Sequence, residues 1–215
     1  SGFYTSRDYE EELAGLRRAN AAHVDVPTVR NAGELRDAYL FRYIIFDYIA
    51  GDTAKDVVPR FSDSEKRTFA HSLRENLARL NRPSNEDFSA RFVRLCANER
   101  WRNFSPTFQT ERMLNLYAGT WVTPVFVHGD ITKENVLICP NGRMCLIDFA
   151  DSGTGPAEYE YPPIVFDLFG YDKTLIRAFY DGTPPEIFVG RLMRATLLHE
   201  YGAFFWRELS RRLCS

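Results

Sequence analysis

Two acidic residues and one asparagine in the middle of the chain have the side chains that metal-assisted phosphoryl transfer requires. Asp130 follows Gly129, Asn135 lies five residues further on, and Asp148 ends a later apolar run. Transfer from a nucleotide needs a carboxylate beside the attacking hydroxyl and oxygen ligands for Mg²⁺ around the phosphates. One base, one amide oxygen and one carboxylate at these positions would form a minimal centre for that reaction.

The tripeptide that contains Asp130, His128-Gly129-Asp130, is not specific by itself, because similar tripeptides occur in ordinary turns. Taken alone, Asp130 is best interpreted as a loop or cap residue. Its combination with Asn135 and Asp148 at this spacing, between predicted strands, favours the functional interpretation.

The elements that must position these residues follow from the flanking sequence. A short apolar strand is expected at 125–127, and a hairpin formed by 135–138 and 144–149 would bring Asp148 back beside Asn135. Nearer the N-terminus we expect a short strand at 26–29 and, because the run is aromatic and β-branched, a buried strand at 39–49. The segment 31–36 between them is polar and contains Gly33.

Most of the remaining chain has the pattern of helices. The clearest helix is 62–81, because Phe69, Leu73, Leu77 and Leu80 fall on one helical face. Further helices are expected at 7–20, 87–98, 110–118, 164–169, 174–180 and 186–213. The last of these is long and aromatic-rich, and its aromatic side chains (Tyr201, Phe204, Phe205 and Trp206) are expected to lie in the core.

The four cysteines predict neither a zinc site nor a disulfide. None of them forms a CxxC pair. A two-residue Asn-Gly turn in the hairpin would pair Cys139 with Met144. Cys139 and Cys145 would then lie on opposite faces and could not bridge. We therefore expect reduced thiols in a cytoplasmic protein.

Composition excludes several classes of protein. Apolar residues make up 45% and charged residues 26% of the 215 residues, which is ordinary for a globular protein with a core. The net charge of −2 does not favour binding to nucleic acid or to an anionic membrane, since both need a basic surface. No apolar stretch is long enough to span a bilayer, and the polar, acidic N-terminus does not resemble a signal peptide.

Two segments of the chain resemble the aminoglycoside phosphotransferase and choline kinase family of the protein-kinase-like superfamily. The family pattern is His-Gly-Asp, four intervening residues and Asn, followed by an apolar strand, a turn and Ile-Asp-Phe or Ile-Asp-Trp. HGDITKEN and LIDFADSG match it. Weaker similarities are found in EEELAGLRRAN, YIIFDYIAG, SLRENLARLN and GPAEYEY. In the last of these, Glu160 stands where the family usually has Asp, and we expect it to be a structural hydrogen-bond acceptor.

The resemblance implies an α+β, protein-kinase-like fold. Residues 1–50 would be a truncated N-lobe with a remnant sheet, and 51–215 a mostly helical C-lobe with the catalytic loop and a metal-binding hairpin. Glu12 is the best match to the helix Glu that pairs with the ATP-anchoring Lys, although it could equally be a helix N-terminal charge. No Lys precedes Lys55 and no glycine-rich loop is found. Either the sequence is a fragment, which we favour, or the protein lacks the phosphate lid by nature. In both cases we expect weak ATP binding by this chain alone.

The resemblance also implies ATP and Mg²⁺ as cofactors and a role for each matching residue. Asp130 would be the catalytic base, braced by His128, and Asn135 and Asp148 would be the Mg²⁺ ligands. Lys133 could reach a phosphate, although a solvated loop lysine is the commoner case. The hinge residues, whose backbone groups would hydrogen-bond adenine, would be Asp47, Tyr48 and Ile49.

The implied function is ATP- and Mg²⁺-dependent phosphorylation of a hydroxyl on a small molecule such as an aminoglycoside, amino alcohol or sugar. The alternative is a catalytically impaired kinase-like binding or regulatory module, or one part of a larger protein. A group of acidic and aromatic residues near Asp148 would suit a cationic acceptor, or would be solvated surface and packed tyrosines: Asp151, Glu158, Tyr159, Tyr161 and Asp172.

Overall fold

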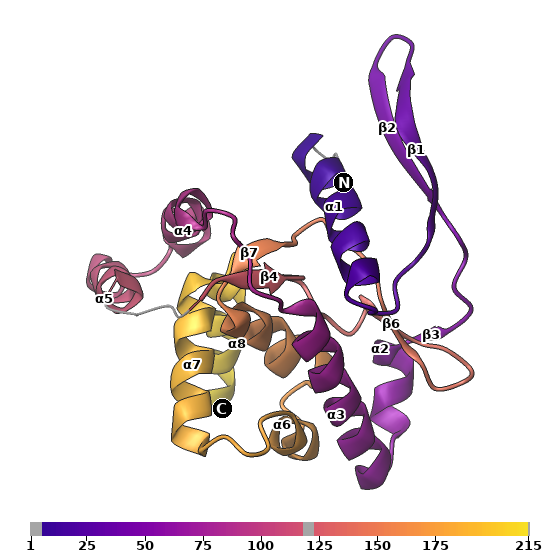
Figure 1. The fold of residues 1–215 in the computed structure, drawn as a ribbon. Helices are drawn as coiled ribbons and strands as arrows, with labels where there is room; N and C mark the ends of the chain where they lie inside the picture. Colours follow the sequence, from indigo (N-terminus) through magenta and orange to yellow (C-terminus); the bar gives the residue numbers. More distant parts are fainter. Residues whose placement is uncertain (1–5, 118–122, 215) are drawn as a thin grey trace.

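The computed structural model describes residues 6–117 and 123–214, which form an α+β fold (Figure 1). A hairpin and one helix stand above a mostly helical body. The first half contains α1 (Ser6–Ala21), β1 (Val29–Arg36), β2 (Leu40–Phe46), β3 (Asp52–Thr53), α2 (Ala54–Val57), the 3₁₀ turn η1 (Val58–Arg60), α3 (Asp63–Leu80), α4 (Ser89–Cys96), η2 (Glu99–Trp101) and α5 (Pro106–Tyr117). The second half contains β4 (Val125–Val127), β5 (Val136–Ile138), β6 (Met144–Leu146), β7 (Gly153–Gly155), η3 (Ala157–Glu160), the π-helix η4 (Pro163–Leu168), α6 (Lys173–Phe179), α7 (Pro185–Leu198) and α8 (Gly202–Cys214).

The long hairpin β1–β2 corrects the prediction of a buried strand. The polar residues 31–36, to which the sequence assigns no element, pair with β2 in an antiparallel ladder from Val29–Phe46 to Arg36–Leu40. The strand expected to be buried is mostly exposed, with Phe41 at 57% and Ile45 at 51%. Among the described residues this sheet has two strands. The β-branched and aromatic residues of the segment therefore report strand propensity and not burial.

Helix α3 forms as its sequence predicts. Ser62 and Glu65 form a capping box at its N-terminus, in which the Ser62 oxygen accepts from the Glu65 N–H and the Glu65 carboxylate accepts from the Ser62 N–H. The face that carries Leu73 and Leu77 is buried and contributes to the main core cluster. Helix α3 packs against α6, whose residues Leu175 and Phe179 belong to the same cluster.

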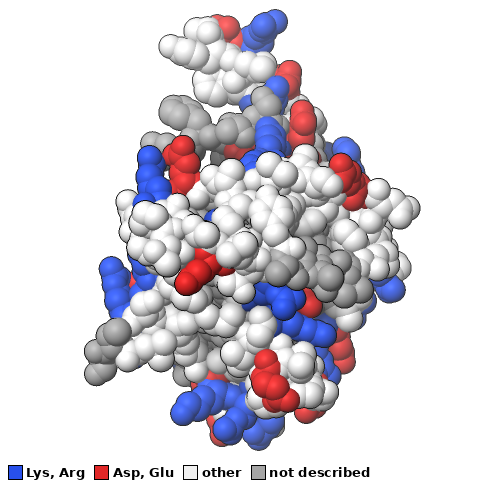
Figure 2. Space-filling view, turned by 90° about the vertical axis from the view of Figure 1, so that its left-hand side faces the viewer, with Lys and Arg blue, Asp and Glu red and all other residues white. Residues whose placement is uncertain are grey.

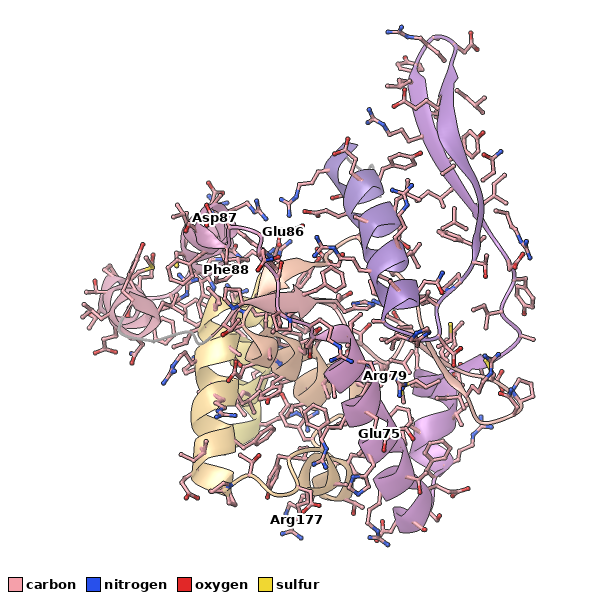
Figure 3. All side chains as sticks on the ribbon, viewed as in Figure 1. Glu75, Arg79, Glu86, Asp87, Phe88 and Arg177 are labelled. Carbon is pink, nitrogen blue, oxygen red and sulfur yellow. The ribbon has the colours of Figure 1, made fainter. Side chains whose placement is uncertain are left out.

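The segment between α3 and α4 connects the upper part of the molecule to the body. Glu86, which lies on this segment (Figure 3), forms an ion pair with Arg18 of α1 and accepts from the Thr154 hydroxyl of β7 at 2.9 Å. Arg18 also lies over the Phe126 ring of β4, with its guanidinium carbon 5.0 Å from the ring centroid. Helix α1 is therefore held against both strands of the β4–β7 sheet.

The β5–β6 hairpin has a different turn from the one predicted. Ile138 pairs with Met144, one residue out of the expected register, and the Cys139 N–H donates to the Arg143 carbonyl at 2.9 Å. Pro140 has no N–H with which to close a two-residue turn, so the loop has three residues and ends on Gly142 at a φ of 79°.

The new register also places two cysteines on one face of the hairpin. Cys139 lies opposite Arg143, and Cys145 is two residues beyond Arg143 on the same strand. The prediction of opposite faces was therefore wrong. Cys96, Cys139 and Cys145 are nevertheless free thiols, as expected.

The C-terminal segment forms two helices and not the single one predicted. α7 ends at Leu198 and α8 begins at Gly202, because His199 has an extended backbone with φ −57° and ψ 143°. A Cβ on Gly202 would lie 1.8 Å from the Thr196 carbonyl oxygen, so only glycine allows the second helix to start so close to the first. Phe204, expected in the core, is 58% exposed.

The surface agrees with the small net charge. Figure 2 shows basic and acidic side chains mixed over one face of the molecule. None of the helices in the described ranges has the length and apolar character needed to cross a membrane.

A second core cluster, built around Trp101, contains a buried arginine. Arg112 of α5 is 4% exposed, and its guanidinium donates to the carbonyls of Leu197 at 2.8 Å, Cys96 at 3.0 Å and Leu95 at 3.1 Å. These carbonyls belong to the last turns of α7 and α4, where helix carbonyls lack intrahelical partners. Arg112 therefore ties three helices together.

Replacing Arg112 with Met should lower the free energy of unfolding by about 3 kcal/mol or more, because three buried carbonyls would lose their donor at roughly 1–3 kcal/mol each. Urea denaturation at neutral pH measures the change. Arg102→Met is the matched control, since the Arg102 side chain is 72% exposed and pairs with Glu99 on the surface. Equal losses in the two variants would contradict the role given to Arg112.

Candidate active site

The loop after β4 is built around a glycine with a left-handed backbone. Gly129 has a φ of 88°, and a Cβ there would lie 2.5 Å from the Asp151 carbonyl oxygen. Glycine is therefore required both by conformation and by close approach. The turn directs the following residue, Asp130, away from the strand and into a partly buried position.

Asn135 is bonded directly to Asp130. Its amide nitrogen donates to the Asp130 carboxylate and to the Asp130 carbonyl, both at 2.9 Å. Asn135 is 9% exposed, and because its nitrogen faces Asp130, its Oδ1 is the atom left for a cation. The predicted base and one predicted ligand thus lie in contact.

Asp148 returns to the same place through the β5–β6 hairpin. The Ile147 N–H donates to the Asn135 carbonyl at 3.1 Å, which joins the two ends of the hairpin. Asp148 is exposed and has a φ of 65°. Its charge contributes to the raised pKa of Asp130, and the preceding residue, Ile147, is hydrogen-bonded to Asn135.

The pKa of Asp130 is raised to about 7. Burial is the main cause, followed by the negative charges of Asp151, Asp148 and Asp167. A carboxylate with a pKa near neutrality is well matched to accept a proton at physiological pH.

His128 braces this loop from inside. It is completely buried, its Nε2 bonds to the Ile147 carbonyl at 3.1 Å, and its Nδ1 accepts from the Asp130 N–H at 3.2 Å. Its ring packs on Phe149, with centroids 4.3 Å apart. Burial lowers the pKa of His128 to about 4. A neutral ring with both nitrogens hydrogen-bonded orients the loop and does not act as a general acid.

Glu160 holds the loop from the other side. Its carboxylate accepts from the His128 N–H at 2.6 Å, the Gly129 N–H at 3.0 Å and the Asn81 amide at 3.3 Å. Glu160 is completely buried. It is a structural acceptor, as expected, and burial raises its pKa against the effect of these donors.

Glu12 of α1 reaches the site from above. It is 8% exposed, and one carboxylate oxygen, Oε2, is buried with no hydrogen-bond partner in the described part of the chain. Burial, and then the charge of Asp148, raise its pKa to about 7. Helix α1 begins at Ser6, so Glu12 lies beyond the first turn and faces the site.

Two of the predicted nucleotide-binding residues, Lys133 and Asp47, have ion-pair partners. Lys133 Nζ bonds to Asp167 of η4 at 3.1 Å. Asp47 forms a two-pronged ion pair with Arg30 at 2.5 and 2.6 Å, and its N–H donates to the Thr28 carbonyl. The backbone of 48–49 is thus the part of the predicted hinge left for a base.

An open pocket of about 380 Å³ lies beside this segment. It is bounded by Tyr48, Ile49 and Ala50 on one side and by the turn from Cys139 to Arg143 on the other. Tyr48 is 91% exposed. The pocket lies between the predicted hinge and the turn of the β5–β6 hairpin, whose strand β5 leads back to Asn135.

The acidic and aromatic residues predicted to line an acceptor site are mostly used elsewhere. Glu158 pairs with Arg191 at 3.5 Å and Asp172 with Lys66 at 2.6 Å. Asp151 does border Asp130, and burial, followed by the charge of Glu200, raises its pKa to about 6. The two aromatic members, Tyr159 and Tyr161, pack against other rings.

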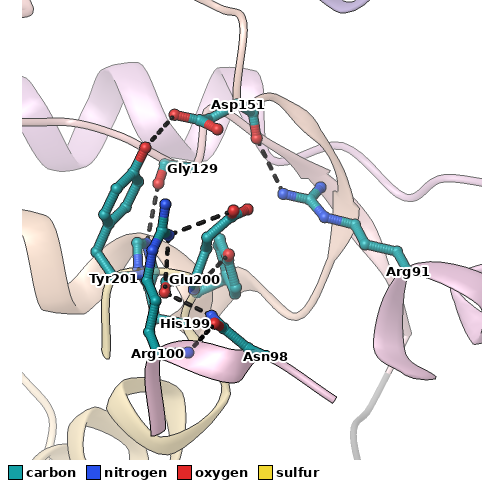
Figure 4. Close-up of polar contacts among 9 residues, drawn as sticks. Arg91, Asn98, Arg100, Gly129, Asp151, His199, Glu200 and Tyr201 are labelled. Carbon is teal, nitrogen blue, oxygen red and sulfur yellow. Dashed lines mark hydrogen bonds and ion pairs between the residues drawn. The ribbon is translucent and has the colours of Figure 1, made fainter. Parts of the chain in front are cut away.

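Glu200 and Tyr201 lie near Asp151, in the break between α7 and α8 (Figure 4). This break was not predicted from the sequence. Tyr201 donates its hydroxyl to the Asp151 carboxylate at 3.5 Å, and Glu200 pairs with Arg100 at 3.3 Å. A continuous helical pattern across 186–213 hid the break. The polar tripeptide His199-Glu200-Tyr201 inside an otherwise apolar stretch is the signal that could have found it.

The donor set fits Mg²⁺ held together with a nucleotide. Asp130, Asn135 and Asp148 offer carboxylate and amide oxygens, which Mg²⁺ prefers. Within the described ranges, no three His, Cys, Asp or Glu side chains are arranged to hold a metal.

Binding of Mg²⁺ should therefore release protons near pH 7. Glu12 and Asp130, with pKa values of about 7, are each half protonated there, and a cation beside Asp148 favours their charged forms. Calorimetry of Mg²⁺·ATP binding in two buffers of different ionisation enthalpy should give about one proton released at pH 7 and almost none at pH 9. An equal release at both values would contradict the assignment.

Comparison with known proteins gives a family and a fold. A model of the phosphotransferase enzyme family matches residues 1–179. No curated protein matches the chain. Among solved structures, the GDP complex of wild-type aminoglycoside 2′-phosphotransferase-IIIa is similar with a TM-score of 0.66 and 16% identity, covering 96% of this chain and 77% of that one.

Two other solved structures have the same architecture. A thermostable mutant of aminoglycoside phosphotransferase APH(4)-Ia with ADP and hygromycin B has a TM-score of 0.66 and 18% identity, covering 96% of this chain and 77% of that one. A choline/ethanolamine kinase family protein from Mesorhizobium loti has a TM-score of 0.59 and 18% identity, covering 98% of this chain and 73% of that one. The fold is thus the kinase-like α+β fold that the sequence predicts.

Proposed function

The chain belongs to the phosphotransferase enzyme family, and from this premise we propose that it transfers the terminal phosphoryl group of ATP, with Mg²⁺, to a hydroxyl of a small molecule. The observation that supports this best is the contact of Asn135 with the Asp130 carboxylate at 2.9 Å, at the point where the hairpin returns Asp148. Base and metal ligands are thus within one small site.

In phosphoryl transfer of this kind the protein forms no covalent bond to the substrate and acts mainly by positioning the reacting groups. Asp130 accepts the proton of the acceptor hydroxyl, and Asn135 fixes the direction of its carboxylate. Asn135 Oδ1 and Asp148 would hold Mg²⁺, which would supply positive charge to neutralise the phosphates. His128 remains neutral and keeps Asp130 in place.

The nucleotide would lie between the part formed by 1–50 and the part formed by 51–215, which act as the two lobes. The adenine would meet the backbone of 48–49 at the open pocket. Lys133 would have to leave Asp167 to reach a phosphate. Similar structures contain GDP or ADP, so GTP should be tested beside ATP. Free thiols and the use of ATP suit the cytoplasm.

An amine-bearing acceptor fits the surroundings of Asp130. The negative charges of Asp151 and Glu200 repel each other, and the Tyr201 hydroxyl donates to the Asp151 carboxylate. A cation placed there would lower this repulsion, although the Arg100 guanidinium already lies over the Tyr201 ring, 4.5 Å from its centroid. Arg100 offsets part of the charge through its pair with Glu200.

The decisive experiment measures release of ADP or GDP with Mg²⁺ and a panel of acceptors. Kanamycin, hygromycin B, choline and ethanolamine are the cationic members, and glucose is the neutral one. Turnover stimulated by a cationic member and not by glucose is expected. Nucleotide binding with no acceptor-dependent release would instead favour the binding module, and absence of nucleotide binding would contradict both.

A further inference from the structure

The break between α7 and α8 contains a histidine that the mechanism above does not use. His199 is completely buried, and its ring stacks on Tyr159 with centroids 4.3 Å apart and planes inclined at 25°. Its Nε2 bonds to the Gly129 carbonyl at 2.9 Å, and its Nδ1 accepts from the Tyr201 N–H at 3.1 Å (Figure 4). Because both nitrogens have partners, the ring is the neutral form with its proton on Nε2.

The bond to Gly129 acts on the peptide that carries Asp130. The carbonyl of this peptide accepts from His199, and its N–H, which belongs to Asp130, donates to His128 Nδ1 at 3.2 Å. The peptide is therefore held at both ends by two buried imidazole rings. Because the peptide is planar, the two rings fix where the Cα of Asp130 lies, and Asn135 then holds the carboxylate from the other end.

The fold is arranged to allow this contact. The extended backbone of His199 ends α7 and turns its ring toward the loop, 70 residues away in sequence. Gly202 then lets α8 start against the carbonyl of Thr196. The next residues, Glu200 and Tyr201, are placed at the side of Asp151 by the same break.

We propose that His199 is a positioning residue, which sets the orientation of Asp130 through the Gly129 carbonyl and couples it to the Glu200–Tyr201 side of the acceptor site. The inference rests on the proposed function for its effect on rate, because it assigns Asp130 as the base. The contact itself can be tested without any reaction. His199 touches no reacting atom in this arrangement and transfers no proton.

Two amide variants separate the contacts of His199. In His199→Gln the side-chain nitrogen can occupy the place of Nε2 and still donate to the Gly129 carbonyl. In His199→Asn the side-chain oxygen can occupy the place of Nδ1 and still accept from Tyr201, but the donor to Gly129 is lost. Both variants lose the stacking on Tyr159, so each is the control for the other in stability.

The first readout is amide hydrogen exchange measured by NMR on the protein without ligands. We expect the Gly129 and Asp130 amides to exchange at least about tenfold faster in His199→Asn than in wild type, and within about threefold of wild type in His199→Gln. Equal exchange in the two variants, or a uniform increase along α7 and α8, would mean that His199 only supports the helix junction, and would overturn the proposal.

The second readout is steady-state turnover of Mg²⁺·ATP with the best acceptor of the panel. His199→Asn should lower kcat about tenfold or more with the KM for ATP unchanged, whereas His199→Gln should keep most of kcat. Loss of kcat in both variants to the same extent would contradict the positioning role. If wild type shows no turnover, the proposed function fails, and the exchange experiment still decides whether His199 holds the loop.

Discussion

Replacing Asp130 with asparagine should lower kcat by about 10²–10⁴-fold, the range expected when a general base is removed. The amide keeps the shape of the side chain and can still bond to Asn135, but it cannot accept the hydroxyl proton. Binding of Mg²⁺·ATP should weaken far less than kcat. The measurement is acceptor-dependent nucleotide turnover beside calorimetry of nucleotide binding.

The same variant should be as stable as wild type or more stable. The Asp130 carboxylate is disfavoured by burial and by the charges of Asp151, Asp148 and Asp167, and a neutral amide removes this repulsion. Asp181→Asn is the matched control, because Asp181 is exposed and contacts Arg74 through its backbone carbonyl. Turnover by Asp130→Asn within a few-fold of this control would remove Asp130 from the mechanism.

The second large effect is expected for Asp148→Asn, which should lower kcat/KM for ATP by about 10³-fold through loss of a charged metal ligand. Asparagine is the substitution of choice here, because the residue has a φ of 65° and Asn tolerates this left-handed conformation better than Ala does. Since Asp148 is exposed, the free energy of unfolding should change little.

An independent measurement distinguishes loss of the metal site from misfolding. Removing the Asp148 charge should lower the pKa of both Asp130 and Glu12, because that charge contributes to raising each of them. Carbon NMR of the side-chain carboxyls without Mg²⁺ reports the two values. Unchanged pKa values together with wild-type turnover would show that Asp148 lies too far from the site to matter.

The proximity of Asp130, Asn135 and Asp148 could be predicted from sequence because it depends on one loop and one hairpin. Asp130 and Asn135 share one loop, and an apolar hairpin leads to Asp148, so spacing alone places them together. The long helix α3 could also be predicted, since its capping residues and its apolar face lie within one segment.

The parts that sequence could not predict depend on contacts between distant segments. The polar tripeptide 199–201 hints at the break between α7 and α8, but nothing within 186–213 signals that the His199 ring bonds to the Gly129 carbonyl. Similarly, the residues 31–36 form a strand because β2 pairs with them, although their own composition is that of a loop. The hairpin register failed for a local reason, the missing N–H of Pro140, which sequence reasoning could have used.

The bond between His199 and the Asp130 loop affects when the site is completed during synthesis on the ribosome. Chains are synthesised from the N-terminus, so the loop with Asp130 emerges long before the ring that holds its last peptide. A nascent chain that has already made its strands and its hairpin would therefore still lack the contact proposed to position Asp130. Under this proposal full activity would arrive late, when the C-terminal helices dock.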